Sequence, residues 1–270
     1  MQTLPNLALI GVGNMGEALL RGLLAAGTLT PDRIVGAEKV ETRAREVAAR
    51  YGIRVETAVE AACRDAEAVI LAVKPQDVDP ALAAIRAAGG SPLVISICAG
   101  IPLARLEQGL GADAAAVRVM PNTPALVGAG ASVYCANSRV TAEQAGWVEA
   151  ILGAVGTVHR VEKEELLDTV TGLSGSGPAY AFAVIEALAD GGVLMGLPRD
   201  LALHLAKQTV FGAAKLALES PEHPAVLRDR VTSPGGTTAA GLRELEARGL
   251  RSALIEAVRT ATLRSRELGG

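Results

Sequence analysis

The sequence has very few aromatic residues and no excess of basic ones. Phe, Trp and Tyr make up 2% of the 270 residues, and 26 Lys and Arg stand against 29 Asp and Glu. A nucleic-acid-binding surface usually needs a basic excess and aromatic side chains that stack on bases. The composition therefore argues against a nucleic-acid partner, and the core must consist mainly of Ala, Val, Leu and Ile.

Cysteine and histidine are also scarce. Three residues of each type lie scattered along the chain: Cys63, Cys98, Cys135, His159, His204 and His223. A low, odd number of cysteines is typical of a reducing compartment. No Cys or His cluster has the spacing of zinc ligands, so we expect no metal site.

Long hydrophobic runs are missing as well. A membrane-spanning helix needs roughly 18–20 apolar residues, and no segment reaches that length. The first five residues contain no basic group, and the short apolar run Leu7–Val12 ends in glycines, which indicates a strand and a turn instead of a signal peptide. We therefore expect a soluble cytoplasmic protein without a membrane partner.

Up to about residue 160, short apolar runs alternate with amphipathic stretches. The apolar runs predict strands at Leu7–Val12, Arg33–Ala37, Ala68–Val73, Leu93–Ala99, Ala115–Met120, Ala131–Ala136 and Val155–Val161. The amphipathic stretches predict helices at Met15–Ala26, Glu41–Tyr51, Pro80–Ala88 and Pro102–Leu110. This alternation is typical of βαβ units and a mostly parallel sheet that is covered on both faces. Residues 1–160 are thus predicted to form an α/β domain.

After residue 160 the strand pattern stops. Helices are predicted at Glu164–Val170, Ala179–Leu194, Arg199–Glu219, Pro224–Arg230, Ala239–Ala247 and Arg251–Glu267. The helix over Ala179–Leu194 is apolar nearly all round, so it must be buried. Residues 161–270 offer little interior for such a helix, which indicates a helical domain that contacts another subunit.

The segment Gly11-Val12-Gly13-Asn14-Met15-Gly16 is a G-x-G-x-x-G motif between the first predicted strand and helix. Gly11 permits a tight turn, Gly13 lets a pyrophosphate approach the backbone, and Gly16 lets the helix pack closely on the strand. The helix N-terminus then offers free N–H groups to the phosphates. We predict a dinucleotide site here; the alternative is a glycine-rich turn that only packs.

The residues after the second strand give conflicting signals about the cofactor. An acid such as Glu38 usually binds an adenine ribose and favours NADH, whereas an arginine or a small hydroxyl residue would favour the 2′-phosphate of NADPH. Here Lys39 follows Glu38 directly, and Arg43 lies nearby. The alternative is that all three are solvated surface charges.

Two further loops follow the carboxyl ends of predicted strands, where parallel sheets bind ligands. One is Ala72-Val73-Lys74-Pro75, whose Lys74 is either a proton donor or a phosphate or solvent contact. The other is Cys98-Ala99-Gly100, in which a core role for Cys98 is favoured over a nucleophilic one because no His or second Cys adjoins it.

The segment Ser233-Pro234-Gly235-Gly236-Thr237-Thr238 precedes a predicted helix. Its glycine N–H groups can converge on an anion, and Thr237 and Thr238 are predicted at the helix N-cap. The segment therefore suits a carboxylate, although an ordinary capped loop is the alternative. Glu186 and Asp190 share one helix face, and for them a structural role is favoured over a catalytic one.

The sequence resembles pyrroline-5-carboxylate reductases over essentially its full length. The resemblance rests on the glycine motif and on these further segments: Ala72–Gln76, Met120–Pro124, Thr171–Tyr180, Asp190–Gly192 and Ser233–Thr238. It implies a Rossmann-type NAD(P)-binding domain over residues 1–160. It also implies an all-helical dimerisation and substrate-binding domain over residues 161–270. The implied activity is NADPH- or NADH-dependent reduction of 1-pyrroline-5-carboxylate to proline.

The resemblance also implies roles for individual residues. Gly11, Gly13, Asn14, Met15 and Gly16 would hold the pyrophosphate, and Glu38 and Lys39 would meet the adenosine end. The nicotinamide side would be lined by Ala72, Val73, Lys74, Pro75, Cys98, Ala99 and Gly100. Substrate would be bound by Glu164, Gly235, Gly236, Thr237 and Thr238, with Thr238 orienting the ring nitrogen as the catalytic residue. The family further implies a homodimer that assembles into a decamer.

The chain departs from the family pattern at one point, and two other functions share parts of the pattern. NADPH-using members often have Ser or Arg where this chain has Ala37 and Glu38, so the cofactor preference is undecided. A β-hydroxyacid or 6-phosphogluconate-type dehydrogenase would share the domain plan but needs a catalytic Lys in the helical domain. The candidates Lys163, Lys207 and Lys215 lack the expected context. A non-catalytic NAD(P)-dependent sensor or scaffold would not need the Ser233–Thr238 anion site.

Overall fold

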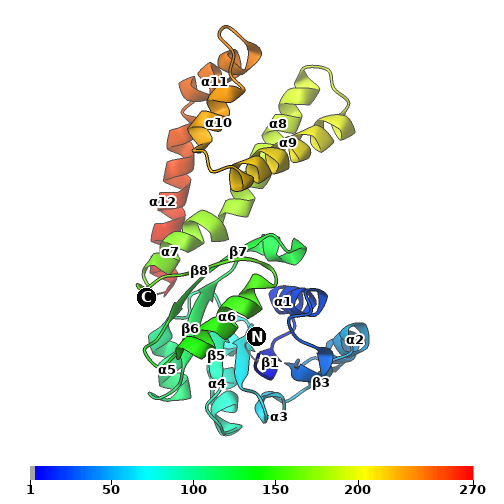
Figure 1. Ribbon diagram of the computed structural model, residues 1–270, viewed down its shortest axis with the longest axis vertical. Coiled ribbons are helices and arrows are strands. Elements are labelled where there is room, and N and C mark those ends of the chain that lie inside the picture. Colours follow the sequence, from blue (N-terminus) through cyan, green and yellow to red (C-terminus); the bar gives the residue numbers. More distant parts are fainter. Residues whose placement is uncertain (1–3, 270) are drawn as a thin grey trace. The chain divides into compact units, whose positions relative to one another are not determined.

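The computed structural model describes residues 4–269, which fall into two compact units. One unit contains the described residues up to Gly175 together with those from Ala261 onward, and the other is Ser176–Thr260. Figure 1 shows both units coloured along the chain, with most of the helices and strands labelled.

In the described chain, eight strands form one sheet in the order β3-β2-β1-β4-β5-β6-β7-β8. Their bounds are β1 Leu7–Ile10, β2 Ile34–Ala37, β3 Arg54–Glu56, β4 Ala68–Leu71, β5 Leu93–Ser96, β6 Ala116–Met120, β7 Gly130–Ala136 and β8 Gly156–Arg160. Neighbouring strands pair in parallel except β6 and β7, which are antiparallel. The mostly parallel sheet and the Rossmann-type fold class are thus confirmed. From β1 the strand order runs towards one edge of the sheet through β2 and β3, and from β4 it runs towards the other edge, so the order reverses between β1 and β4.

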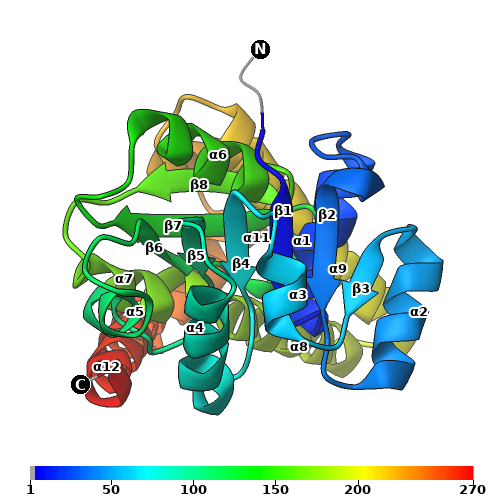
Figure 2. The same cartoon turned by 90° about the horizontal axis from the view of Figure 1, so that it is seen from below.

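Helices cover both faces of this sheet, as Figure 2 shows from below. They are α1 Asn14–Ala25, α2 Glu41–Tyr51, α3 Val59–Cys63, α4 Val78–Ala87, α5 Leu103–Leu110, α6 Ala142–Gly153 and α7 Leu166–Val170. Short 3₁₀ turns occur at η1 Pro31–Arg33, η2 Pro75–Asp77 and η3 Thr123–Val127, and a π turn, η4, at Thr171–Gly175.

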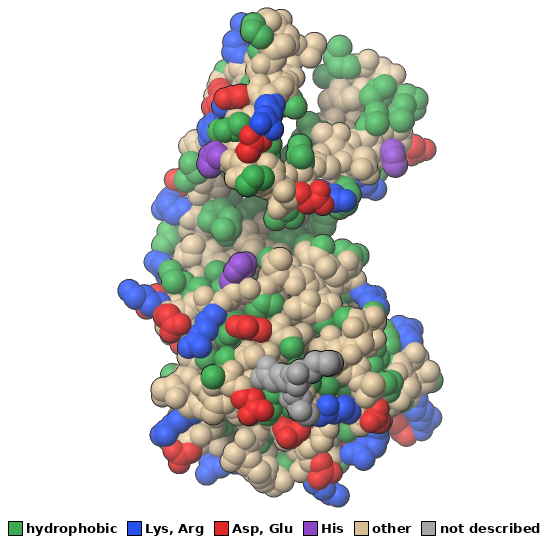
Figure 3. Space-filling model, in the orientation of Figure 1, with side chains coloured by type: hydrophobic (Ala, Val, Ile, Leu, Met, Phe, Trp, Pro, Cys, Tyr) green, Lys and Arg blue, Asp and Glu red, His purple; other side chains and the backbone are tan. Residues whose placement is uncertain are grey.

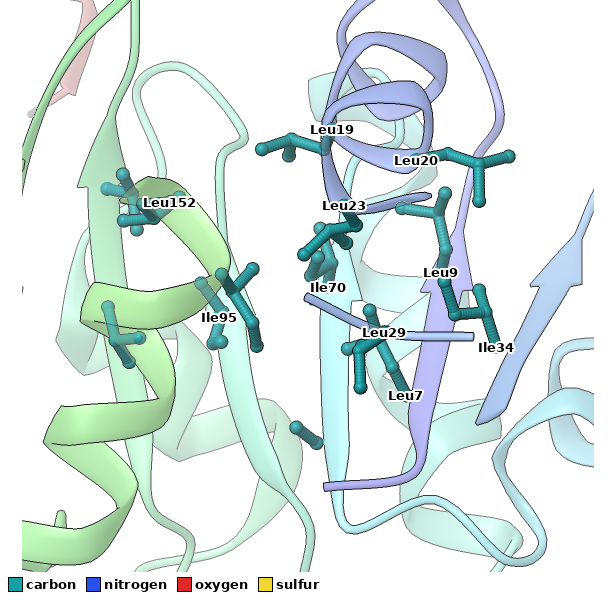
Figure 4. Packing of buried hydrophobic residues seen from close by; sticks show 14 of the residues in the cluster. Leu7, Leu9, Leu19, Leu20, Leu23, Leu29, Ile34, Ile70, Ile95 and Leu152 are labelled. Carbon is teal, nitrogen blue, oxygen red and sulfur yellow. The ribbon is translucent and has the colours of Figure 1, made fainter. Parts of the chain in front are cut away.

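Alternate residues of the strands feed two separate cores. Leu7 and Leu9 of β1 belong to the core beneath α1 and α6, whereas Ala8 and Ile10 belong to the core beneath α3, α4 and α5. Figure 4 shows the first of these cores, with Leu23 of α1 packed over the strands. The central strands β1, β4 and β5 are buried on both faces and largely apolar, which is why their positions were predictable.

Several elements differ from the prediction. Strands β1, β4 and β5 end two or three residues earlier than predicted, because the apolar pattern continues into the loops that follow them. The short elements β3 and α3 and the whole of α6 were missed. Helix α6 carries a signal that was overlooked, since Thr141 and Gln144 form a capping box at its start.

The second unit is helical, as predicted for this part of the chain. It contains α8 Gly177–Leu194, α9 Arg199–Glu219, α10 Pro224–Arg230, α11 Thr237–Ala247 and most of α12 Leu250–Gly269. Helices α8 and α9 pack around a small core of alanines, namely Ala189, Ala202 and Ala206.

Large apolar side chains stay at the surface of this helical unit, where Figure 3 shows them over α8 and α9. Phe182 and Phe211, the only two phenylalanines of the sequence, are 65% and 61% exposed. None of the helices described here has the length and apolar character to cross a membrane. Exposed apolar surface of this extent is typical of an interface between folded chains.

Candidate functional site

A cleft of about 560 Å³ opens at the carboxyl ends of β1, β2 and β4. It lies at the point where the strand order reverses, which is where open parallel sheets bind their ligands. The predicted cofactor residues that line it are Gly11, Gly13, Glu38, Lys39, Ala72, Val73 and Lys74. Tertiary structure thus brings three separate sequence segments to one cleft.

The turn after β1 has the backbone geometry that the glycine motif predicts. Gly11 has a φ of +92°, and its N–H donates to the Ala37 carbonyl over 3.0 Å. A Cβ atom on Gly16 would lie 2.2 Å from the Gly11 carbonyl oxygen, so only glycine lets α1 start so close to β1. A Cβ on Gly13, by contrast, would meet no atom within 4 Å, which leaves open space for a ligand beside this backbone.

Helix α1 begins at Asn14 with Gly13 as its N-cap, and no side chain caps it. The backbone N–H groups of its first turn, from Asn14 and Met15 onward, therefore have no side-chain acceptor. Together with the helix dipole, they suit a phosphate group. The space at Gly13 and this uncapped helix fit the pyrophosphate of a dinucleotide.

The charges after β2 are all engaged. A Glu38 oxygen accepts the Val40 N–H over 3.0 Å, and Lys39 forms a 3.1 Å ion pair with Asp77 across the chain. Arg43 is not a solvated surface charge, because its side chain is 29% exposed and pairs with Glu17 and Glu46.

The cleft also has walls that the sequence analysis missed. They are formed by Val40, Thr57, Val59, Gln76, Asp77, Pro80 and Ala81. Thr57 and Val59 follow β3. This strand has only three residues and is too polar to show a strand pattern in the sequence. Gln76 and Asp77 belong to η2, which begins at Pro75. Their position could have been predicted, because they follow the carboxyl end of a predicted strand, where parallel sheets bind ligands.

The predicted segment Cys98-Ala99-Gly100 does not line this cleft, but Cys98 lies directly behind it. The Cys98 sulfur is 3.2 Å from the Val73 carbonyl oxygen and 3.4 Å from that of Leu71. Burial raises the pKa of the Cys98 thiol, so it is protonated at neutral pH. The core role is thereby supported. Among residues 4–269, no three His, Cys, Asp and Glu side chains are grouped to hold a metal ion.

The Ser233–Thr238 segment belongs to the helical unit and forms a tight turn. The Gly236 N–H donates to the Ser233 carbonyl over 3.0 Å, and Gly235 has a φ of +68°. Helix α11 begins at Thr237 with Gly236 as N-cap and without any side-chain cap. The predicted N-cap role of Thr237 and Thr238 is therefore wrong, because the glycine turn leads directly into the helix.

This correction changes which groups face an anion. The Gly236 N–H is used within the turn, so the available donors are the first N–H groups of α11. Thr238 is half-buried, and its hydroxyl does not cap the helix.

Glu164 belongs to the other unit, beside β6. Its Oε1 atom accepts from the Leu103 N–H over 2.8 Å and from Arg118 over 2.9 Å. Arg118 also lies 3.8 Å from Asp168, which accepts a hydrogen bond from Ser265 of α12. The carboxylate thus helps to hold the start of α5, and both of these bonds use the same oxygen.

Two family models match the chain. Residues 164–268 match the model described as pyrroline-5-carboxylate reductase dimerisation. Residues 6–100 match the model described as NADP oxidoreductase, coenzyme F420-dependent.

Curated relatives and solved structures match nearly the whole chain. The pyrroline-5-carboxylate reductase of Synechocystis sp. is 51% identical, over 97% of this chain and 98% of the relative. That of Arabidopsis thaliana is 46% identical, over 96% and 94%. A reductase structure from Coxiella burnetii has a TM-score of 0.95 at 36% identity, and covers 99% of this chain and 100% of the other.

A structure from Plasmodium falciparum with NADP bound has a TM-score of 0.87 at 33% identity and covers 100% of both chains. Prephenate dehydrogenase from Aquifex aeolicus, at 16% identity and a TM-score of 0.54, shares the fold alone. The strong similarities thus extend through both units and include the helices that follow the sheet.

Proposed function

The chain belongs to the pyrroline-5-carboxylate reductase family, and we propose that the N-terminus of α1 binds the cofactor and the N-terminus of α11 binds the substrate. Each of these two helices has a glycine as its N-cap. The enzyme reduces the C=N bond of 1-pyrroline-5-carboxylate to proline with NADPH or NADH. The observation that carries the residue assignment is that α1 and α11 both begin at a glycine without a side-chain cap.

The first helix start serves the cofactor. Gly11, Gly13, Asn14, Met15 and Gly16 hold the pyrophosphate through backbone N–H groups and the space beside Gly13. The remaining assigned residues surround the two ends of the dinucleotide. Glu38 and Lys39 meet the adenosine end, and Ala72, Val73, Lys74 and Pro75 form the nicotinamide side. Ala99 and Gly100 extend this side beyond the cleft, and Cys98 supports it from behind.

The second helix start serves the substrate carboxylate. The turn at Gly235 and Gly236 positions the first N–H groups of α11, and the helix dipole adds positive potential there. Thr237 and Thr238 are the first two residues of this helix, and the Thr238 hydroxyl orients the ring nitrogen. Glu164 is a further substrate-side acid, whose Oε2 atom takes no part in the bonds to Leu103 and Arg118.

The reaction needs little more than this positioning. NADPH or NADH, when bound, supplies a hydride. The protonated cyclic imine is already electrophilic, so holding its carbon and nitrogen in the correct orientation is the main task of the protein. Orientation of this kind can lower a barrier by roughly 7–11 kcal/mol.

We further propose a homodimer formed through the helical domain, residues 161–270, with dimers assembling into a decamer. The exposed phenylalanines of α8 and α9 support the dimer. A cytoplasmic location is supported by three cysteines that are all free and buried.

The activity is tested by following NAD(P)H absorbance with 1-pyrroline-5-carboxylate and, in reverse, with 3-hydroxyacids. We expect rapid oxidation with the imine and no reverse reaction with the hydroxyacids. Turnover of a 3-hydroxyacid alone would instead indicate the dehydrogenase alternative, and cofactor binding without any turnover would indicate a sensor.

A further inference from the structure

Lys39 and Arg43, the two basic side chains nearest to the end of β2, already have acidic partners. Lys39 pairs with Asp77, and Arg43 pairs with Glu17 and Glu46. A basic group at this point of a Rossmann-type fold is the usual partner of the 2′-phosphate of NADPH. In this chain the phosphate must therefore compete with carboxylates for each cation.

The two cations are held to different degrees. The Lys39–Asp77 pair is exposed, with 75% and 38% of the two side chains accessible. Exposed ion pairs of this kind contribute little, so Lys39 is easily released. The Glu17 side chain is only 17% exposed, and Arg43 is 29% exposed. Arg43 is thus the cation whose availability depends on its acidic partner.

Glu17 is fixed from several sides. Besides Arg43, it accepts from the Tyr51 hydroxyl over 2.7 Å and from Arg50 over 2.8 Å, both on α2. Burial raises the pKa of Glu17, but the bonds from Tyr51 and Arg43 outweigh this effect and lower it, so the carboxylate is ionised at neutral pH. The Arg43 Nη2 atom that pairs with Glu17 also donates to the Val12 carbonyl over 3.3 Å, which places the guanidinium beside the turn that lines the cleft.

We propose that Glu17 sets the choice between NADPH and NADH by holding Arg43 away from the 2′-phosphate. The inference rests on the proposed use of the cleft for the cofactor. Because the two cofactors differ only in that phosphate, a change in Arg43 availability alters the affinity for NADPH and leaves that for NADH nearly unchanged.

The test is a double-mutant cycle of Glu17→Gln and Arg43→Gln, with the dissociation constants of NADPH and NADH measured by nucleotide fluorescence without substrate. Glu17→Gln keeps an acceptor for Arg43 but removes the competing charge. We expect it to strengthen NADPH binding relative to NADH by about tenfold, as expected for one charge-assisted hydrogen bond of about 1.4 kcal/mol. The double variant should lose this gain.

Two controls separate this role from a structural one. Tyr51→Phe removes a bond to the same carboxylate but keeps its charge, so the NADPH-to-NADH ratio should stay within about twofold. Glu46→Gln, at an exposed pair of 3.4 Å, should do the same. Melting curves of all variants show whether each one is folded.

An unchanged ratio in folded Glu17→Gln, or an equal change for both cofactors, would overturn the proposal. If Glu17→Gln does not fold, the Arg43→Gln variant tests the proposal by itself. If Glu17 keeps Arg43 away from the 2′-phosphate, removing Arg43 should lower the NADPH preference by less than about threefold, and a larger loss would contradict the proposal. Because binding is measured without the imine, a failure of the proposed reaction would appear only in the turnover assay.

Discussion

At the scale of single residues, both proposed binding segments share one device. Gly13 precedes α1 and Gly236 precedes α11, each in the N-cap position that Ser, Thr, Asp or Asn more often occupies. A side-chain cap would cover backbone N–H groups of the first turn. The glycine leaves them open to a phosphate or a carboxylate.

Gly13→Val tests the first of these positions. The Cβ position at Gly13 is empty, and the backbone there is extended, so the fold should be retained. The branched side chain would occupy the space proposed for the pyrophosphate, and NAD(P)H binding should be lost. Fluorescence titration measures this effect, and wild-type affinity in a folded variant would contradict the assignment.

Substitutions at Thr238 test the proposed substrate site at the start of α11. Thr238→Ala should lower kcat/KM by about tenfold to hundredfold, because a hydrogen bond to a charged group is worth about 1.5–3 kcal/mol. Thr238→Ser should keep most of the activity, and neither change should alter the cofactor Kd, because Gly11–Gly16 lies in the other unit.

The melting temperature provides the control for Thr238. Since Gly236 is the N-cap, Thr238→Ala removes no cap, and alanine is a better helix former than threonine. The Ala variant should therefore melt no lower than wild type. A stable Ala variant with wild-type kcat/KM would rule out the proposed role of the hydroxyl.

At the scale of elements, the cofactor cleft depends on how closely α1 packs against its neighbours. Gly22, in the middle of α1, faces the segment between α6 and β8. A Cβ atom on it would lie 2.3 Å from a Val155 methyl group and 2.9 Å from the Ala154 carbonyl oxygen. This contact sets the position of the helix whose first turn faces the cofactor.

Gly22→Ala should destabilise the protein although alanine favours helices. Helix propensity contributes about 1 kcal/mol in favour of alanine, whereas overpacking beside buried Val155 costs about 1–3 kcal/mol. Thermal melting should show a Tm lowered by a few degrees. Gly153→Ala is the matched control, because its Cβ would meet no atom within 4 Å, and its Tm should not fall. Equal Tm values for both variants would show that α1 can shift without cost.

At the scale of the whole molecule, the two units differ in how they bury apolar residues. The sheet unit has two extensive cores, whereas the helical unit has a small alanine cluster and exposes both phenylalanines. Monomeric proteins rarely expose contiguous apolar surface of this extent. The helical unit therefore has the composition of a subunit interface.

Replacing both Phe182 and Phe211 by Ser should lower the sedimentation coefficient of the proposed assembly towards that of a monomer in analytical ultracentrifugation. Each substitution removes a large apolar contact area, and areas of this kind dominate interface energetics. Val127→Ser is the control, because Val127 is 81% exposed but belongs to the sheet unit, and it should leave the assembly unchanged. A double variant that still sediments as the wild type would place the interface elsewhere.

Sequence alone determined the features that depend on near neighbours. The alternating apolar runs indicated the parallel sheet, the glycine motif indicated the turn at Gly11, and the all-round apolar pattern of Ala179–Leu194 indicated a subunit interface. These patterns were sufficient because the spacing of residues within a strand or helix decides which face is buried.

Tertiary structure alone decided the partners of the charged groups. Arg43 meets Glu17 across 26 residues of sequence, and Lys39 meets Asp77 across 38. Local spacing carries no information about such pairs, because strand order and helix packing bring their side chains together. The same reason explains why the sequence showed the basic residues after β2 but not that carboxylates already hold them.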